Sequence, residues 1–179
     1  MYILGQVLGI ASTVCTIILP FFKKKWQILA LNIAVNLLVA SNLALIGQVG
    51  SGIFLCLVAV VQSIVSMRHD QKGTPVSLFE KILFLVLYVG FGFFGIFTAP
   101  DFVPAINTKN LLELMPIVGA LMLMFSVFSK TEQTMRKFLL VNATIWTIYT
   151  AIVGSTAFFT DLVCMCSTTT ALIKYRKKA

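Results

Sequence analysis

One polar helix face is predicted between residues 138 and 153. Asn142, Trp146 and either Tyr149 or Thr150 recur at intervals of three or four residues, so they would share one side of a helix. They offer an amide, an indole and a hydroxyl group. This combination is typical of a pocket for a small polar solute.

A second pair of amides, Asn32 and Asn36, is also four residues apart and would share a helix face. Each asparagine alone is as well explained by a hydrogen bond between helices, worth about 0.6–2 kcal/mol in a membrane. Asn36 and Asn142, however, occupy matching positions of an internal repeat. We therefore interpret the two together as solute-binding residues on either side of one site.

Three further side chains are weaker candidates. Ser63 and Thr169 also match in the repeat and would place hydroxyl groups at one depth, although such hydroxyls more often bond their own backbone. Asp161 is expected about six residues into the last helix, roughly 9 Å from its end. Its carboxylate would either couple protons or recognise a cation, or lie at a wet helix end.

Nothing in the sequence predicts an enzyme, a cofactor or a metal site. A nucleophile with a neighbouring base is not found, and His69 is the only histidine. Cys164 and Cys166 are two residues apart and would point to different sides of a helix. The spacing of Gly90, Gly92 and Gly95 resembles a dinucleotide fingerprint, but in an apolar run it favours close helix packing.

The elements that must position these residues are membrane helices. Of the 179 residues, 59% are hydrophobic and 11% charged, and the mean hydropathy of +0.97 excludes an ordinary soluble domain. The net charge of +8 comes from short clusters between apolar runs, which indicates membrane topology and not a nucleic-acid partner. Seven apolar stretches are long enough, or nearly so, to span a bilayer: 2–22, 27–46, 49–67, 81–99, 111–128, 138–153 and 155–173.

The basic residues predict the orientation of these helices. With the N-terminus outside, seven crossings place thirteen of the fourteen Lys and Arg on one side and only Lys109 on the other. The positive-inside rule makes the crowded side cytoplasmic, so the C-terminus is expected in the cytoplasm. The clusters on that side are Lys23–Lys25; Arg68, Lys72 and Lys81; Lys130, Arg136 and Lys137; and Lys174, Arg176, Lys177 and Lys178.

A weak internal repeat relates residue i to residue i+106. It aligns Gln27 with Gln133 and Arg68 with Lys174, in addition to Asn36 with Asn142. We therefore predict an all-α membrane protein with a first triple-helix repeat over 1–68, a cytoplasmic loop, linker helix and outer loop over 69–109, and a second repeat with a basic tail over 110–179. Three crossings are an odd number, so the two repeats run parallel, and a site would lie between them near mid-membrane.

This three-plus-one-plus-three plan resembles that of the SWEET and PQ-loop transporters, although proline–glutamine pairs are absent. A closer resemblance, over most of the chain, is to the YgjV-type bacterial inner membrane proteins. It is carried by Gln6-Val-Leu-Gly9, Leu114-Met-Pro-Ile-Val-Gly119, Thr134-Met-Arg136 and the acidic residue of the last helix with the basic tail after it. The resemblance implies a multi-pass protein of the bacterial inner membrane.

Two functions are consistent with these features. The first is a secondary carrier that moves a small polar metabolite, such as a sugar, a vitamin or an amino acid, by alternating access. The second is a structural or accessory membrane protein whose polar residues only join helices. The expected surroundings are the lipid bilayer and a small polar solute, and a monomer is favoured over a homo-oligomer because one chain carries both repeats.

Overall fold

The computed structural model describes residues 2–45, 51–97, 112, 114–153 and 157–175. Within these residues the chain forms seven α-helices and a short 3-10 helix, which confirms the all-α prediction. Lys109 and the side chain of Thr150 lie outside the described part. The elements are α1 (Tyr2–Ile18), η1 (Leu19–Phe21), α2 (Lys25–Leu45), α3 (Ser51–Lys72), α4 (Leu78–Phe97), α6 (Leu114–Val127), α7 (Glu132–Val153) and α8 (Ala157–Tyr175).

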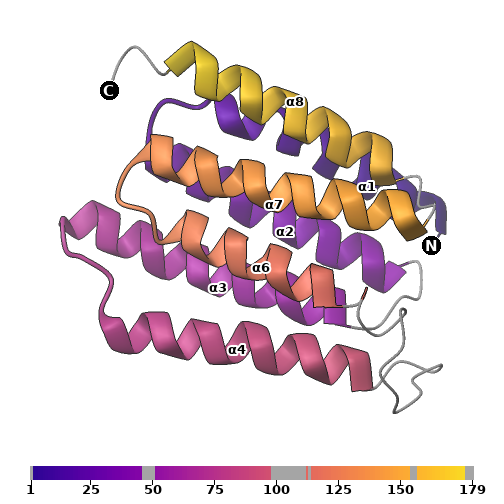
Figure 1. Ribbon diagram of the computed structural model, residues 1–179, viewed down its shortest axis with the longest axis horizontal. Helices are drawn as coiled ribbons and strands as arrows, with labels where there is room; N and C mark the ends of the chain where they lie inside the picture. Colours follow the sequence, from indigo (N-terminus) through magenta and orange to yellow (C-terminus); the bar gives the residue numbers. More distant parts are fainter. Residues whose placement is uncertain (1, 46–50, 98–111, 113, 154–156, 176–179) are drawn as a thin grey trace.

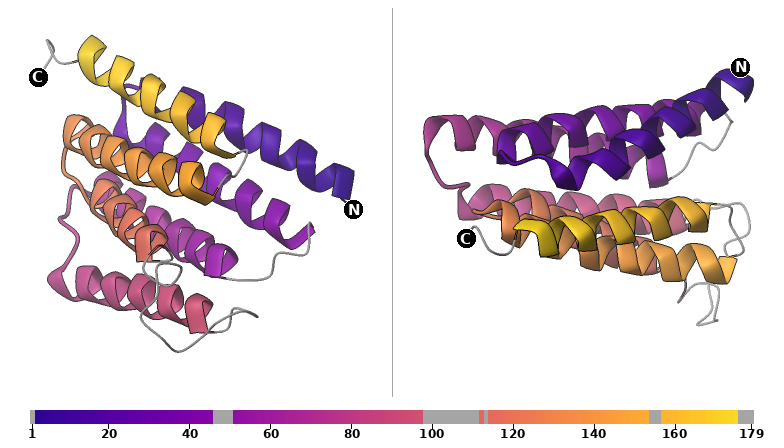
Figure 2. Two further views of the ribbon diagram at one scale, coloured as in Figure 1. Left: turned by 45° about the vertical axis from the view of Figure 1, so that its right-hand side comes forward. Right: turned by 90° about the horizontal axis from the view of Figure 1, so that it is seen from above.

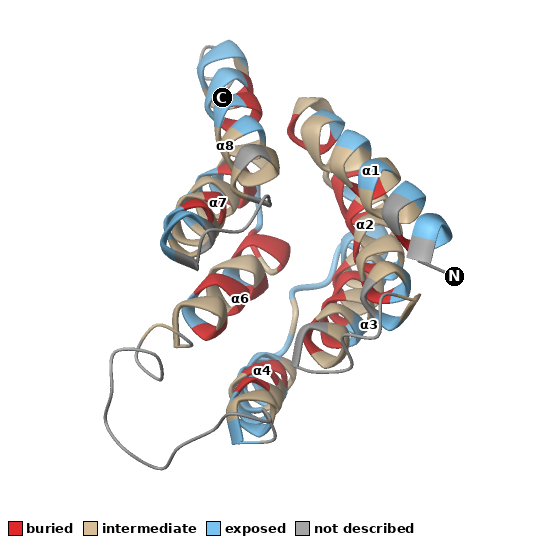
Figure 3. Ribbon diagram, turned by 90° about the vertical axis from the view of Figure 1, so that its right-hand side faces the viewer, coloured by how far each residue is buried: buried red, intermediate tan, exposed pale blue. Residues whose placement is uncertain are grey.

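The helices run alternately in opposite directions and lie in two rows (Figures 1 and 2). One row holds α1, α2 and α3, and the other holds α8, α7, α6 and α4 (Figure 3). Each helix packs against the next one described along the chain, and the rows also meet where α1 contacts α8 and α3 contacts α6. In both of these contacts between rows, the two helices run in the same direction.

Two predicted helix boundaries were wrong at the end where the basic residues gather. The helix α3 continues to Lys72 instead of ending at residue 67, because Gly73, at a φ of 64°, ends it in a left-handed turn. In this turn Thr74 N donates to His69 O and Gly73 N to Asp70 O, at 3.0 and 3.2 Å. The apolar run of α3 ends at residue 67, but the left-handed turn at Gly73 decides where the helix itself ends. The helix therefore extends beyond its apolar run.

The start of α7 differs for the same reason. It begins at Glu132 instead of residue 138, because Thr131 caps it: the hydroxyl of Thr131 accepts a hydrogen bond from Thr134 N at 3.2 Å. At the start of α4, the Glu80 carboxylate accepts from Ser77 N at 2.8 Å while Glu80 N donates to Ser77 Oγ at 3.2 Å, which forms a capping box.

Apolar side chains pack between the helices and also cover the outer surface. One buried cluster joins α3, α4 and α6, and a second joins η1, α2, α6 and α7 at the basic end. Large apolar side chains such as Ile3, Phe79 and Ile173 are exposed, as is typical of a surface in contact with lipid. Three of the described helices are long and apolar enough to cross a membrane, over Ile3–Phe21, Ile53–Lys72 and Leu78–Phe97.

Candidate functional site

The predicted polar face of α7 forms at the contact with α6. Gly119 is buried on α6, and a β-carbon there would lie 2.8 Å from Trp146 Nε1 and 3.4 Å from Asn142 Oδ1. The ring of Trp146 meets that of Tyr149 edge-on, with 5.7 Å between ring centroids. The structure thus brings Asn142, Trp146 and Tyr149 together, and the absence of a side chain at Gly119 leaves room for them.

The amide oxygen of Asn142 is buried, and no described residue donates a hydrogen bond to it. A buried acceptor without a donor costs about 1–3 kcal/mol. Lipid cannot supply the missing hydrogen bond, since its tails carry no polar groups. Among the described residues, this oxygen is the one buried side-chain nitrogen or oxygen atom that lacks a hydrogen-bond partner.

The side-chain amides of Asn32 and Asn36 donate hydrogen bonds within the group of helices α1, α2 and α3. Asn32 Nδ2 donates to Ser63 Oγ at 2.9 Å and so joins α2 to α3. Asn36 Nδ2 donates to Asn32 O in the same helix at 2.8 Å. All three residues are buried. The described hydrogen bonds do not join this group to Asn142, so the predicted pairing of Asn36 with Asn142 across one site stays a prediction.

The surroundings of Thr169 differ from those of its repeat mate Ser63. Its side chain is exposed, and its hydroxyl donates to Met165 O of its own helix at 2.8 Å, whereas its repeat mate Ser63 is fully buried. The buried hydroxyl residues on α8 are Ser167 and Thr168, and Thr168 is the repeat mate of Gln62. An alignment one residue out of phase places a side chain on another face of a helix, because each residue turns the helix by about 100°.

Asp161 lies in the second turn of α8 and is half-buried. It takes part in an interaction with its surroundings. Both of its predicted roles, proton coupling and a wet helix end, stay predictions.

Gln62 is a buried residue that joins helices and was not predicted as a site residue. Its side chain joins three helices: Nε2 donates to Met124 O of α6 at 2.9 Å, and Oε1 accepts from the hydroxyl of Tyr88 on α4 at 2.8 Å. One turn further along α3, Ser66 Oγ donates to Val127 O at 2.8 Å. These bonds fasten α3 to the opposite row of helices, and three polar residues at helical spacing (62, 63 and 66) were the available signal.

Arg136 was predicted to be one of the basic residues on the cytoplasmic side, yet its side chain is buried. The guanidinium donates from Nε to Pro20 O at 2.9 Å and from its terminal nitrogen to Phe22 O at 2.6 Å. It stacks 4.7 Å from the ring centroid of Tyr175, whose hydroxyl donates to Phe21 O at 2.9 Å. We call Arg136 and Tyr175 the latch, because they join α7 and α8 to η1 and to Phe22, which follows η1.

Replacing Gly119 with alanine should displace Trp146. The added methyl group would lie within 3.1 Å of two indole atoms, so the ring must move, and we expect the free energy of unfolding to fall by about 1 kcal/mol. The fluorescence of Trp146, recorded with Trp26 replaced by phenylalanine, should shift. Gly90→Ala is the matched control, because a β-carbon at position 90 meets no atom within 4 Å. Equal effects of the two substitutions would contradict the close contact.

A comparison with protein families finds one model that matches nearly the whole sequence. The family is Imp-YgjV, described as a bacterial inner membrane protein, and the match covers residues 3–179. No curated protein and no solved structure matches the chain.

Proposed function

Since this chain belongs to the Imp-YgjV family of bacterial inner membrane proteins, we propose that it is a secondary carrier that moves a small polar metabolite across that membrane by alternating access. The observation that carries the proposal is the buried amide oxygen of Asn142, which lacks a donor among the described residues and lies next to Trp146. A hydroxyl or amino group of a sugar, a vitamin or an amino acid would supply that donor.

The arrangement of the helices supports the proposal. If α1, α2 and α3 are exchanged for α6, α7 and α8, the contact of α1 with α8 becomes the contact of α6 with α3, and both contacts are present. That is the pattern of two parallel triple-helix repeats related by an axis along the helices, with α4 as the linker. In this proposal all seven helices cross the membrane, the N-terminus is outside and the basic end is cytoplasmic.

The latch has a clear role in such a carrier. Arg136 and Tyr175 belong to the second repeat, and the carbonyl groups they bind at Pro20 and Phe21 belong to η1 in the first. Rocking of one repeat against the other toward an inward-open state would break these bonds. The described conformation is then the one that is closed at the basic end.

A second function, that of a structural or accessory protein, is favoured by one observation. The side chains of Asn32, Asn36, Gln62 and Ser66 all form hydrogen bonds within the helix bundle. Polar residues used in this way join helices and need no solute. The two functions differ in whether Asn142 is reached by a ligand.

The carrier predicts that a small metabolite stabilises the purified protein through Asn142. A ligand at one hundred times its dissociation constant adds about 2.7 kcal/mol to the free energy of unfolding, which a thermal-stability screen of sugars, vitamins and amino acids detects. The stabilisation should be lost in Asn142→Ala and kept in Asn42→Ala. Asn42 is a suitable control because its amide donates to Gly5 O, at the contact of α1 with α2.

The accessory function would follow from the opposite result. In that case no compound would stabilise the protein, and a cysteine introduced by Asn142→Cys would not react with water-soluble thiol reagents from either side of the membrane. If a ligand is found, the remaining parts of the carrier proposal are tested with it. Asp161→Asn should abolish any pH dependence of uptake, and transport by a protein shown to be monomeric would establish that one chain is sufficient.

A further inference from the structure

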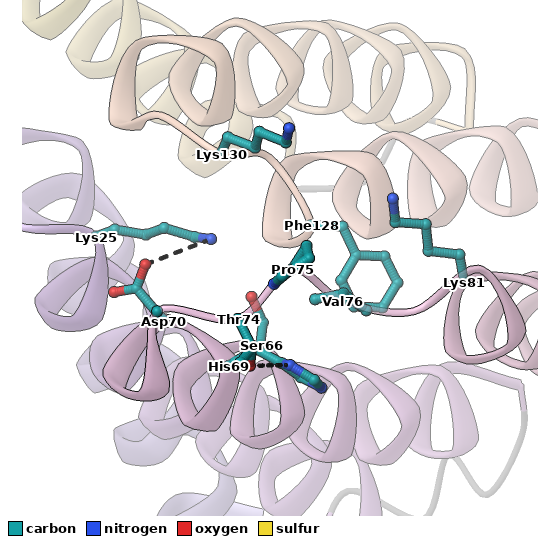
Figure 4. A pocket seen from close by; sticks show the side chains of 11 residues that line it. Lys25, Ser66, His69, Asp70, Thr74, Pro75, Val76, Lys81, Phe128 and Lys130 are labelled. Atoms are coloured by element: carbon teal, nitrogen blue, oxygen red, sulfur yellow. Dashed lines mark hydrogen bonds and ion pairs between the residues drawn. The ribbon is translucent and has the colours of Figure 1, made fainter.

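A pocket of about 410 Å³ opens at the basic end of the helices (Figure 4), and Asn142 does not belong to its lining. Its walls come from the start of α2, the end of α3, the connection from α3 to α4, the first turn of α4 and the connection from α6 to α7. Three lysines line it: Lys25, Lys81 and Lys130.

The three lysines lie at the same end of the molecule because successive helices run in opposite directions. The helices α2, α4 and α7 all start at this end, and each lysine lies at or near the start of one of them. A cation near a helix N-terminus is disfavoured by the helix dipole. Their position is therefore not explained by the stability of these helices.

Two of the three lysines in the pocket form no ion pair with a described residue. Lys25 Nζ lies 3.9 Å from the carboxylate of Asp70, which is the single acidic residue in the lining. Lys81 and Lys130 have no carboxylate within 4 Å among the residues that the structure describes. His69, also in the lining, is hydrogen-bonded to Thr74 and Glu80 at 2.9 and 3.0 Å. Two lysines are thus available to an anion.

The pocket also has an apolar side. Phe128, Pro75 and Val76 belong to its lining, and in Figure 4 they lie between Lys25 and Lys81. An inorganic anion alone would leave this side in contact with water. A ligand that combines an anionic group with an apolar portion would use both sides of the pocket.

We propose that this pocket binds a phosphate group that is attached to an apolar portion, with Lys81 and Lys130 as the residues that hold the phosphate. The positive charge of lysine suits phosphate oxygens, and basic pockets between membrane helices bind anionic lipid headgroups. The phosphate would come either from an anionic phospholipid or from a soluble organic phosphate. This site goes beyond the carrier proposal and does not depend on it.

The test compares two double variants that remove the same charge. Lys81→Gln with Lys130→Gln removes the two available lysines of the pocket, and Lys23→Gln with Lys24→Gln removes two exposed lysines outside its lining. The full-length protein is purified in a neutral detergent. Binding of phosphatidylglycerol, phosphatidylcholine and hexyl phosphate, which is a soluble phosphate with an apolar chain, is then measured by native mass spectrometry and by the midpoint of thermal unfolding.

We expect phosphatidylglycerol or hexyl phosphate to raise the midpoint of thermal unfolding of the wild type and of the Lys23/Lys24 variant. The Lys81/Lys130 variant should bind at least tenfold more weakly, and each of its single substitutions should lose part of the affinity. Binding of phosphatidylglycerol alone identifies a lipid, and binding of hexyl phosphate identifies a soluble organic phosphate. Equal affinities of the two double variants, equal binding of phosphatidylcholine, or no binding to the wild type would each overturn the proposal.

Discussion

Replacing Arg136 with alanine should lower the free energy of unfolding by about 3 kcal/mol, because hydrogen bonds from a charged group contribute about 1.5–3 kcal/mol each and are not fully additive. The variant loses both hydrogen bonds to the carbonyl groups of Pro20 and Phe22 and the stacking on Tyr175. It also leaves the carbonyl oxygen of Pro20 in η1 without its buried donor. The effect is measured by titrating the purified protein with a denaturing detergent.

Lys137→Ala is the matched control for this prediction. Lys137 is the next residue along α7 and is exposed, so its removal should change stability by less than about 0.5 kcal/mol. Arg136→Lys keeps the charge but not the two-pronged geometry, and should lie between the wild type and the alanine variant. Similar losses in the free energy of unfolding at positions 136 and 137 would show that stability depends on positive charge at this end of α7 and not on the contacts of the latch.

Replacing Gln62 with alanine should cost about 2–3 kcal/mol. Hydrogen bonds between membrane helices are worth about 0.6–1.7 kcal/mol each, and Gln62 forms two of them; the space left by its side chain adds a further cost. The hydroxyl of Tyr88, which is fully buried, would also lose its acceptor. Detergent-induced unfolding is again the measurement.

A double-mutant cycle separates these contributions. Tyr88→Phe removes one of the two bonds, so its effect in the Gln62→Ala background should be smaller than in the wild type. Val61→Ala is a control on the same helix, since Val61 is 53% exposed and should tolerate truncation. Additive effects of the Gln62 and Tyr88 substitutions would mean that their hydrogen bond contributes nothing.

The helices were predictable from the sequence because each long apolar stretch lies between short polar breaks. All seven predicted stretches correspond to a described helix, and the errors lie at the ends of α3 and α7. There, capping by Thr131 and the left-handed Gly73 decide the boundary, and neither changes hydropathy. The polar face of α7 was predictable for a similar reason, since Asn142 and Trp146 follow the helical period.

Contacts between distant segments were not predictable. Arg136 resembles any other basic residue near a helix start, and only the packing of α7 beside η1 shows that it is buried. The role of Gln62 was not predicted, because its partners lie on α4 and α6, far from it in sequence. At Thr169 a match in the repeat did not preserve the direction of the side chain, and its hydroxyl donates to its own helix, which was the stated alternative.

The latch also has a consequence for biosynthesis. The carbonyl groups of η1 are made well before their donors, which follow 116 residues later for Arg136 and 154 residues later for Tyr175. At about 5–20 residues per second, the synthesis of Arg136 follows that of Pro20 by roughly 6–23 s. The helix α1 is therefore made before its final neighbours, and η1 gains both of its hydrogen-bond donors only after α8 has been made.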